Sequence, residues 1–247
     1  MTKDTTCLVV PCFNEQIRLD EKKYEELVGT GLFSLLFVDD CSTDKSVSIL
    51  NSYVDRWPQH VTVVHHTKNL GKGEAVRSGL LAGIAFGHSQ IAFMDADFAI
   101  PPAEVMRFVQ EAKRFPDKSI FLGSRVQLLG SNIDRTFMRH LSGRLFATVA
   151  SIVTKTKIYD SQCGLKLFVV NDHLKASLSK EFRTRWLFDL EIIQRLKTQT
   201  EGTDGSNWIE ENAVEIPLRE WNEVPGTKFS FVAQLKSMVQ LILVTKP

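Results

Sequence analysis

Two aspartates separated by one residue, Asp95 and Asp97, stand at the end of an apolar run at residues 91–94. The run predicts a buried parallel strand, and the proline pair at 101–102 breaks the chain beyond it. Ligands of open α/β sheets bind at the carboxyl ends of the strands. Carboxylates there suit a hard divalent cation, Mg²⁺ or Mn²⁺, that can hold a diphosphate. Taken alone the motif is more often a solvated turn, so the interpretation needs support from the rest of the chain.

Other reactive side chains follow the earlier apolar runs. The loop after residues 7–10 offers a flat apolar contact from Phe13 and a carboxylate from Glu15, which suit a base and a sugar hydroxyl. Asp39 follows residues 35–38, where a carboxylate can accept the imide N–H of uracil or an N–H of guanine. An ordinary turn and a helix cap are the structural alternatives at these two places.

A glycine-containing loop, residues 69–73, precedes a predicted helix. Glycines let the backbone approach a ligand closely, and a helix N-terminus favours an anion, so Gly71 and Lys72 are candidates for nucleotide binding. A dinucleotide-binding fingerprint is excluded because Val76 replaces its last glycine, and no Walker A sequence is present. Arg125 ends a further apolar run, where it could pair with a phosphate or lie on the surface.

The composition narrows the class of protein. The 247 residues are within the range of one large α/β domain, and 43% of them are hydrophobic, enough for a substantial core. A net charge of +1 argues against bulk nucleic-acid binding. The four cysteines form no metal-like spacing, and no signal peptide is evident, so we expect a cytoplasmic protein. No apolar stretch approaches the roughly 18–20 residues that span a bilayer.

Strand and helix patterns alternate along the first half, which predicts a doubly wound, mostly parallel sheet with helices on both faces. The second half is less regular. Strands are expected near residues 7–10, 35–38, 61–64, 91–94, 120–122, 164–168 and 214–218. Helices are expected near residues 20–28, after a cap at 42–44, at 72–86, 135–155 and 188–196, and at the C-terminus.

Taken in order, these motifs make the chain resemble the family 2 glycosyltransferases of the GT-A fold. Three downstream segments are similar to the branch that transfers sugars to polyprenyl phosphates, closest to the dolichyl-phosphate glucosyltransferases, with the dolichyl-phosphate mannose synthases more distant. The first set is residues 9–15, 38–44, 69–73, 95–97 and 123–125, and the downstream set is residues 160–168, 185–191 and 221–228.

The resemblance implies one GT-A domain over residues 1–247, with a nucleotide-sugar half at 1–125 and an acceptor half with amphipathic helices at 126–247. It implies that Asp95 and Asp97 bind the metal, that Asp39 contacts the nucleobase, and that Arg125 lies near the diphosphate and the acceptor phosphate. The metal, Mg²⁺ or Mn²⁺, then stabilises the departing nucleoside diphosphate. Glucosyltransferases of that branch usually carry an N-terminal membrane anchor, which this sequence does not show.

The acceptor decides what other chemistry is needed. A lipid phosphate is already an anion near neutral pH and needs cations rather than a base, whereas a hydroxyl acceptor needs a carboxylate base. The predicted helix near 135–155 has an apolar stripe beside Arg135, Arg139, Ser142 and Arg144, which could hold a lipid phosphate at a membrane surface. Packing on the sheet with a solvated basic face is the alternative.

The remaining site candidates come from the downstream segments. Asp160 could order Arg144 or Arg139, lie near the anomeric carbon or cap a turn, and Gln162 could reach the sugar or the metal. Trp186 could lie under the sugar ring or pack in the core. Asp189 and Glu191 do not share a helix face, so only one should enter the site. The predicted nucleotide-sugar site therefore comprises Pro11, Phe13, Glu15, Asp39, Gly71, Lys72, Asp95, Ala96, Arg125, Gln162, Trp186 and Asp189, with Asp97, Arg125 and Asp160 as catalytic residues.

The favoured hypothesis is metal-dependent transfer of a hexose, most simply glucose from UDP-glucose, to a polyprenyl phosphate, with peripheral contact at the cytosolic membrane face. The alternatives are a soluble transferase acting on a sugar, lipid or small-molecule hydroxyl, a GDP-mannose-dependent polyprenyl-phosphate mannosyltransferase, and a nucleotide-sugar-binding regulator. An apolar pattern at residues 231–242 suits core or homodimer packing, or membrane contact.

Overall fold

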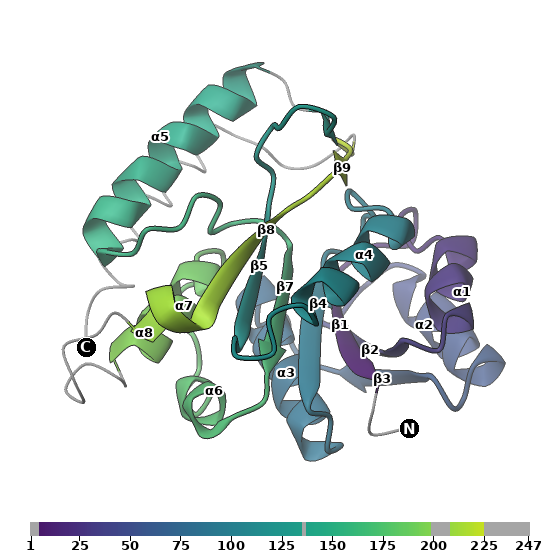
Figure 1. Cartoon of the computed structure of the whole chain (residues 1–247). Helices are drawn as coiled ribbons and strands as arrows, with labels where there is room; N and C mark the ends of the chain where they lie inside the picture. The colour runs from purple at the N-terminus through teal and green to yellow at the C-terminus, as the bar shows by residue number, and fades with distance from the viewer. Residues whose placement is uncertain (1–4, 135–136, 199–207, 225–247) are drawn as a thin grey trace.

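A computed structural model describes residues 5–134, 137–198 and 208–224, with only the backbone for residues 137–145. A seven-stranded sheet with the order β3-β2-β1-β4-β7-β5-β8 forms the centre of the described chain, and β6 and β9 make a separate two-stranded pair (Figure 1). All pairings in the large sheet are parallel except those of β7, which runs antiparallel to β4 and β5. The predicted mostly parallel α/β sheet is confirmed.

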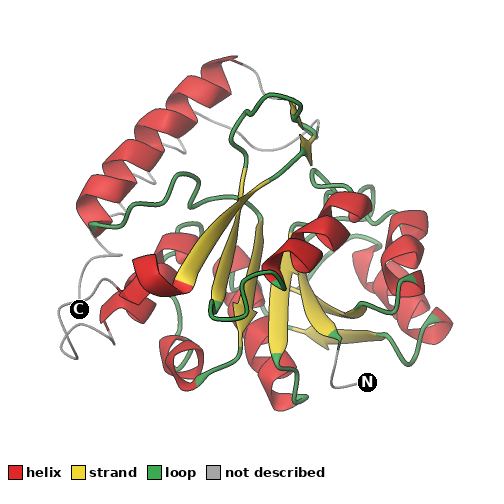
Figure 2. Cartoon of the chain, in the orientation of Figure 1, coloured by secondary structure: helices red, strands yellow, loops and turns green. Residues whose placement is uncertain are grey.

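The helices and strands agree with the predicted alternation in the first half (Figure 2). The strands are β1 Thr6–Cys12, β2 Phe33–Asp39, β3 Val61–His65, β4 Gln90–Met94, β5 Ile120–Ser124, β6 Asn132–Ile133, β7 Leu165–Val169, β8 Ala213–Pro217 and β9 Glu220–Trp221. The helices are α1 Glu21–Gly29, α2 Ser46–Arg56, α3 Lys72–Ala85, α4 Pro102–Ala112, α5 Phe137–Thr154, α6 Asp172–Ser177, α7 Phe188–Thr198 and α8 Trp208–Asn212.

Two local expectations need correction. The proline pair does not merely break the chain, because Pro102 is the first residue of α4. The fixed φ angle of proline suits the first turn of a helix. The cap expected at residues 42–44 also differs: α2 begins at Ser46, and Asp44 accepts a hydrogen bond from the Ser46 amide at 2.9 Å. The predicted C-terminal helix lies outside the described residues.

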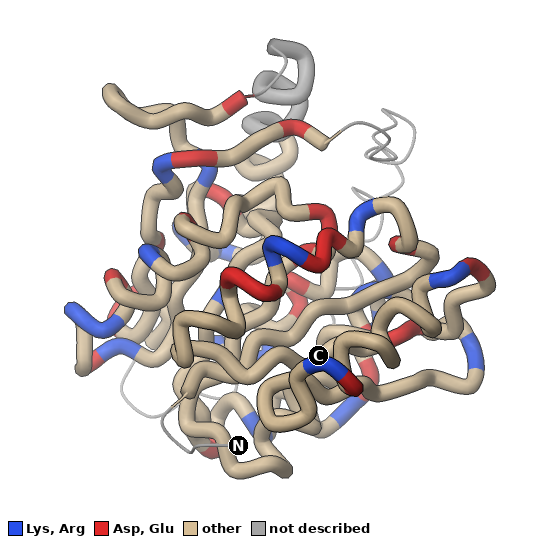
Figure 3. Tube along the Cα trace, turned by 90° about the vertical axis from the view of Figure 1, so that its right-hand side faces the viewer, with Lys and Arg blue, Asp and Glu red and all other residues tan. Residues whose placement is uncertain are grey.

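Two apolar layers cover the sheet, one on each face. Side chains alternate along β1, so Leu8 and Val10 pack with α1, α2 and α4, whereas Cys7 and Val9 pack with α3. The second layer also takes residues of α6, α7 and α8. Helix α5 lies apart from the sheet and packs on the start of α7 through Phe146 (Figure 1). Both signs of charge are interspersed along the described chain (Figure 3).

Gly79 sets the distance between α3 and the sheet, because a Cβ at this position would collide with Val9 and lie 3.0 Å from Val38 Cγ2. We therefore predict that Gly79→Ala lowers the free energy of unfolding by about 1–3 kcal/mol through overpacking. Gly29→Ala is the control, since it adds a Cβ at the end of α1 with nothing within 4 Å. Denaturant unfolding measures both, and equal midpoints for the two variants would contradict this account.

Candidate active site

Several of the predicted site residues that the structure describes follow strands at one edge of the sheet. The carboxyl ends of β1, β2, β4 and β5 point to this edge because these strands are parallel to one another. Strand β7 runs the other way, so the turn before it, residues 160–164, reaches the same edge from the opposite direction. The antiparallel strand thereby brings Asp160 and Gln162 beside the residues that follow β4 and β5.

Asp95 and Asp97 follow β4 at the centre of this edge. Burial and the charge of Asp95 raise the pKa of Asp97, and the amide of Ala99, which donates to Asp97 Oδ1 at 3.0 Å, counters this only in part. Lys72, the first residue of α3, places its Nζ 2.5 Å from Asp95 Oδ1. Burial opposes the charged form of Lys72, but Asp95 and then Asp189 outweigh it and raise its pKa.

The turn before β7 packs directly against Asp95. A Cβ on Gly164 would lie 2.7 Å from Asp95 Cγ and closer still to Oδ2. Only a glycine fits here without moving the carboxylate. This close approach limits the space available to the Asp95 carboxylate, and the sequence motif alone gave no reason to single out Gly164.

A buried ion pair lies beneath the carboxylates. Lys166 is fully buried on β7, and its Nζ donates to Asp189 Oδ1 at 2.5 Å and to the Cys163 carbonyl at 2.7 Å. Burial raises the pKa of Asp189, and Lys166 and then Lys72 counter that rise. Asp189 therefore sits between two lysines at the start of α7. Lys166 escaped the sequence analysis because a lysine within an apolar strand gives no sign of its partner.

Arg125 and Asp160 form a bidentate pair at the end of β5. Arg125 Nε donates to Asp160 Oδ2 at 2.7 Å, and its Nη2 donates to Oδ1 at 2.8 Å. The guanidinium lies 5.7 Å from the Trp221 ring centre. Glu215 on β8 accepts the amides of Tyr159 and Asp160 at 2.8 and 2.9 Å, which fixes the turn that carries Asp160. Asp160 thus orients Arg125, a partner that the sequence analysis did not consider. The side chains of Arg139 and Arg144, which it was expected to order, lie outside what the structure describes.

Asp39 and Asp40 end β2, and both are buried. Asp39 Oδ1 accepts the Ser42 amide at 3.1 Å, and its Oδ2 lies 3.4 Å from His65 Nδ1. Asp40 accepts the amides of Leu70 and Gly71 at 2.8 and 2.7 Å, so it shapes the glycine loop rather than reaching a ligand.

The loop after β1 lies beside these residues. Pro11 is buried, whereas Phe13 is exposed and available for a flat contact. Arg18 pairs with Glu15 at 3.0 Å. Burial raises the pKa of Glu15, Arg18 opposes that rise, and Asp97 adds to it. Glu15 is thus within electrostatic reach of the Asp95–Asp97 pair, as a sugar-binding carboxylate beside a metal site would be.

The segment before α7 closes over the glycine loop. Arg185 donates to the Asn69 side chain, and a Cβ on Gly71 would lie 2.5 Å from Arg185 Nε. Trp186 is 60% exposed, so its ring is available to a ligand instead of being part of the core. Glu191, buried on α7, accepts the amides at positions 183 and 184 and thereby holds this segment.

Other predicted residues are placed less completely. Ala96 is buried between the two aspartates, and Gln162 is half-buried in the turn before β7. Arg135 and the side chains of Arg139, Ser142 and Arg144 lie outside what the structure describes. The helix predicted to carry them exists as α5, so the backbone part of that prediction is confirmed.

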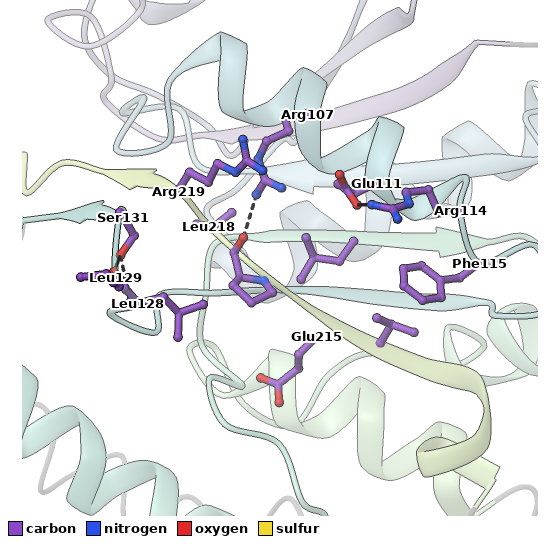
Figure 4. Close-up of a pocket in the computed structure, with 14 residues that line it drawn as sticks. Arg107, Glu111, Arg114, Phe115, Leu128, Leu129, Ser131, Glu215, Leu218 and Arg219 are labelled. Atoms are coloured by element: carbon purple, nitrogen blue, oxygen red, sulfur yellow. Dashed lines mark hydrogen bonds and ion pairs between the residues drawn. The ribbon is translucent and has the colours of Figure 1, made fainter.

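A groove of about 540 Å³ lies away from the carboxylates, between α4, the edge strand β8 and the loop after β5 (Figure 4). Leu128 and Leu129 line it from the loop, and Arg107, Arg114 and Arg219 line it from the opposite side. Leu129 is fully exposed and Leu128 is 51% exposed. The groove offers apolar and cationic surface but no catalytic carboxylate pair.

The described residues suit a metal only with help from a ligand. Asp95 and Asp97 supply hard oxygen atoms. Burial and then the charge of Asp95 raise the pKa of Asp97, and a divalent cation would neutralise this anionic pair. No group of three or more His, Cys, Asp or Glu among the described residues forms a complete cage. This arrangement fits Mg²⁺ or Mn²⁺, which bind through one or two carboxylates together with substrate phosphates and water.

Searched over its described residues, the structure contains no helix with the length and apolarity needed to cross a bilayer.

Comparison with known proteins places these features in a family. The model of the family described as "Glycosyl transferase family 2" matches residues 7–173. A dolichyl-phosphate beta-glucosyltransferase of Trichomonas vaginalis is 28% identical over 253 residues, 96% of this chain and 69% of that protein. The protein of the same name from Drosophila melanogaster is 30% identical over 242 residues, 90% of this chain and 68% of its own length.

The fold has solved counterparts. Glucosyl-3-phosphoglycerate synthase from Mycobacterium tuberculosis, solved with Mn²⁺, UDP and phosphoglyceric acid, superposes with a TM-score of 0.66 at 15% identity. The superposition covers 97% of this chain and 76% of that one. At this identity the likeness speaks to the fold, which is GT-A.

The Arg125–Asp160 pair yields a prediction about stability. Asp160→Ala should lower the free energy of unfolding by about 3 kcal/mol, because it leaves a mostly buried guanidinium without its carboxylate. The double variant Arg125→Met/Asp160→Ala should cost less than the two single changes together, since no charge is then left unpaired. A double-mutant cycle in urea measures this, and strict additivity would contradict the pairing.

Proposed function

The chain belongs to glycosyl transferase family 2, and we propose that this glycosyltransferase moves glucose from UDP-glucose to a dolichyl or other polyprenyl phosphate. The observation that carries the proposal is the similarity, over nine-tenths or more of this chain, to proteins named dolichyl-phosphate beta-glucosyltransferase. That similarity extends through the turn before β7 and the segment before α7, which supply half of the site.

The donor's diphosphate and its metal are proposed to lie at Asp95 and Asp97. A bound Mg²⁺ or Mn²⁺ would neutralise the charge that develops on the departing nucleoside diphosphate. The M. tuberculosis synthase, a neighbour in fold, was solved with Mn²⁺ and UDP, which supports this choice of ligands. Lys72 is the nearest cation to the pair and is proposed to contact the diphosphate once a donor is bound.

The nucleobase and the sugar are proposed to lie on either side of the Asp95–Asp97 pair. Asp39 ends β2 in a buried position, from which it can accept an N–H of the base. Phe13 and Glu15 lie in the adjacent loop and suit the base and the ribose. Trp186, exposed before α7, is proposed to lie against the sugar ring. Asp189 supports that segment through Lys166 instead of reaching the sugar directly.

Transfer to a phosphate acceptor requires no base. The acceptor's phosphate oxygen forms the bond to the anomeric carbon as the bond from that carbon to the UDP oxygen breaks, and the electron pair leaves with UDP. Cations must hold the two phosphates near each other. Arg125, oriented by Asp160, is proposed for this role together with Arg135, Arg139, Ser142 and Arg144 of the α5 segment.

A polyprenyl phosphate also requires contact with a membrane. The loop after β5 exposes Leu128 and Leu129 in the same groove that Arg107, Arg114 and Arg219 line (Figure 4). Full burial of a leucine contributes roughly 1.5–3 kcal/mol, and each basic residue near an anionic surface contributes about 1 kcal/mol. We propose that this loop touches the cytosolic membrane face.

The central experiment is a product assay. Purified protein is incubated with UDP-glucose, a short polyprenyl phosphate and Mn²⁺ or Mg²⁺, and the lipid product is identified by mass. We predict glucosyl-phospholipid formation that stops in excess chelator, and a loss of at least about a hundredfold in kcat for Asp97→Asn, because the leaving diphosphate is then poorly neutralised.

The product assay also separates the alternatives. GDP-mannose run in parallel would reveal a mannosyltransferase. Transfer only to alcohols or free sugars would overturn the phosphate acceptor and favour a transferase that acts on hydroxyls. Full activity in chelator would contradict the metal role.

Membrane contact gives a second prediction. Leu129→Asp should weaken sedimentation with anionic vesicles and raise KM for a long polyprenyl phosphate severalfold, because a charge replaces the fully exposed leucine. UDP affinity should stay unchanged. Phe86→Asp is the control, since Phe86 is also exposed but follows α3 at the opposite edge of the sheet. Equal vesicle binding by the two variants and the unmodified protein would count against this loop.

A further inference from the structure

Lys72 and Asp95 pair at the place where the metal is proposed to bind. The Nζ of Lys72 lies 2.5 Å from Asp95 Oδ1, and that oxygen accepts no hydrogen bond from any other described residue. The ammonium would therefore compete with a divalent cation for the same carboxylate, and for the same oxygen if the cation binds through Oδ1. Neither side chain is fully enclosed, because 27% of Lys72 and 36% of Asp95 remain exposed, so the pair can open.

Lys72 has a second anion within reach. Asp189 raises the pKa of Lys72 after Asp95 does, and Asp189 is itself fixed by the fully buried Lys166 at 2.5 Å. The Phe188 ring centre lies 6.0 Å from Lys72 Nζ. A lysine displaced from Asp95 therefore keeps a carboxylate and an aromatic face beside it and does not move into an uncompensated environment.

We propose that Lys72 regulates metal binding: it occupies Asp95 while the donor site is empty and releases it to the metal when a nucleoside diphosphate arrives. The proposal rests on the donor and metal of the proposed function. The diphosphate supplies the anion that draws the ammonium away, and Lys72 begins α3, where the helix dipole also favours an anion. Metal and nucleotide then bind cooperatively, each strengthening the other by the same factor.

Direct binding of Mn²⁺ tests this without any turnover. Free Mn²⁺ is measured by electron paramagnetic resonance with and without UDP. The unmodified protein should bind Mn²⁺ weakly alone and at least about tenfold more tightly with UDP, within the usual range of coupling between sites. Lys72→Met should bind Mn²⁺ alone about tenfold more tightly than the unmodified protein, because the competing ammonium is gone. UDP should then strengthen Mn²⁺ binding by a smaller factor than in the unmodified protein, since its phosphates still ligate the metal but no longer have to displace an ammonium.

Three further variants make the test specific. Lys68→Met removes the same charge from the exposed loop before α3 and should match the unmodified protein. Lys72→Arg keeps a cation and should also bind Mn²⁺ weakly when UDP is absent. In an Asp95→Asn background, Lys72→Met should no longer increase Mn²⁺ affinity, since the shared ligand has changed.

The outcomes separate regulation by Lys72 from the proposed metal site on which it rests. If the unmodified protein binds Mn²⁺ with UDP but Lys72→Met, shown to be folded by its thermal transition, binds Mn²⁺ alone no more tightly, the regulation is overturned and the metal site stands. If no Mn²⁺ binds to the unmodified protein even with UDP, the metal site itself is overturned, and the regulation with it.

Discussion

Two carboxylates at the end of a buried strand repel each other, and much of the surrounding structure compensates for that repulsion. Burial and then the charge of Asp95 raise the pKa of Asp97, and Asp95 pairs with the ammonium of Lys72. Asp189 and Lys166 form a further pair of opposite charges, which is buried in the core. The charges of such a site partly cancel without a ligand. Its carboxylate oxygen atoms can still bind a cation that arrives together with anionic groups.

Carboxylates also hold the loops around the site in place. Asp40 accepts two amides of the glycine loop, Glu191 accepts two amides before α7, and Glu215 accepts two amides before β7. Each of these acids comes from a strand end, helix or strand of the framework, whereas each amide belongs to an irregular segment. Hydrogen bonds from amides to a carboxylate are stronger than those between neutral groups. The framework therefore fixes loops that have few regular backbone bonds of their own.

The sequence predicted the parallel half of the fold well, because each buried strand reads as an apolar run that ends in a polar loop. It placed Asp39, Asp97 and Arg125 at the ends of strands that point to the same edge as Asp95, whereas their roles in binding stay predictions. It did not predict the direction of β7, since strand polarity depends on pairing across the sheet. Lys166 and Gly164 were missed for the same reason: a buried lysine and a small residue acquire meaning only from partners distant in the sequence.

The polarity of β7 brings the residues of the proposed donor and acceptor sites to one edge of the sheet. A parallel strand in its place would have carried the turn at residues 160–164 to the far edge, leaving Arg125 without Asp160. Because the turn arrives here, Asp160 orients the arginine while Gly164 packs on Asp95, and one short segment contacts both the proposed metal pair and the proposed acceptor cation. A shift of that segment would move both together. If the donor and acceptor phosphates bind where proposed, the backbone of one turn, rather than two independent loops, sets their relative positions.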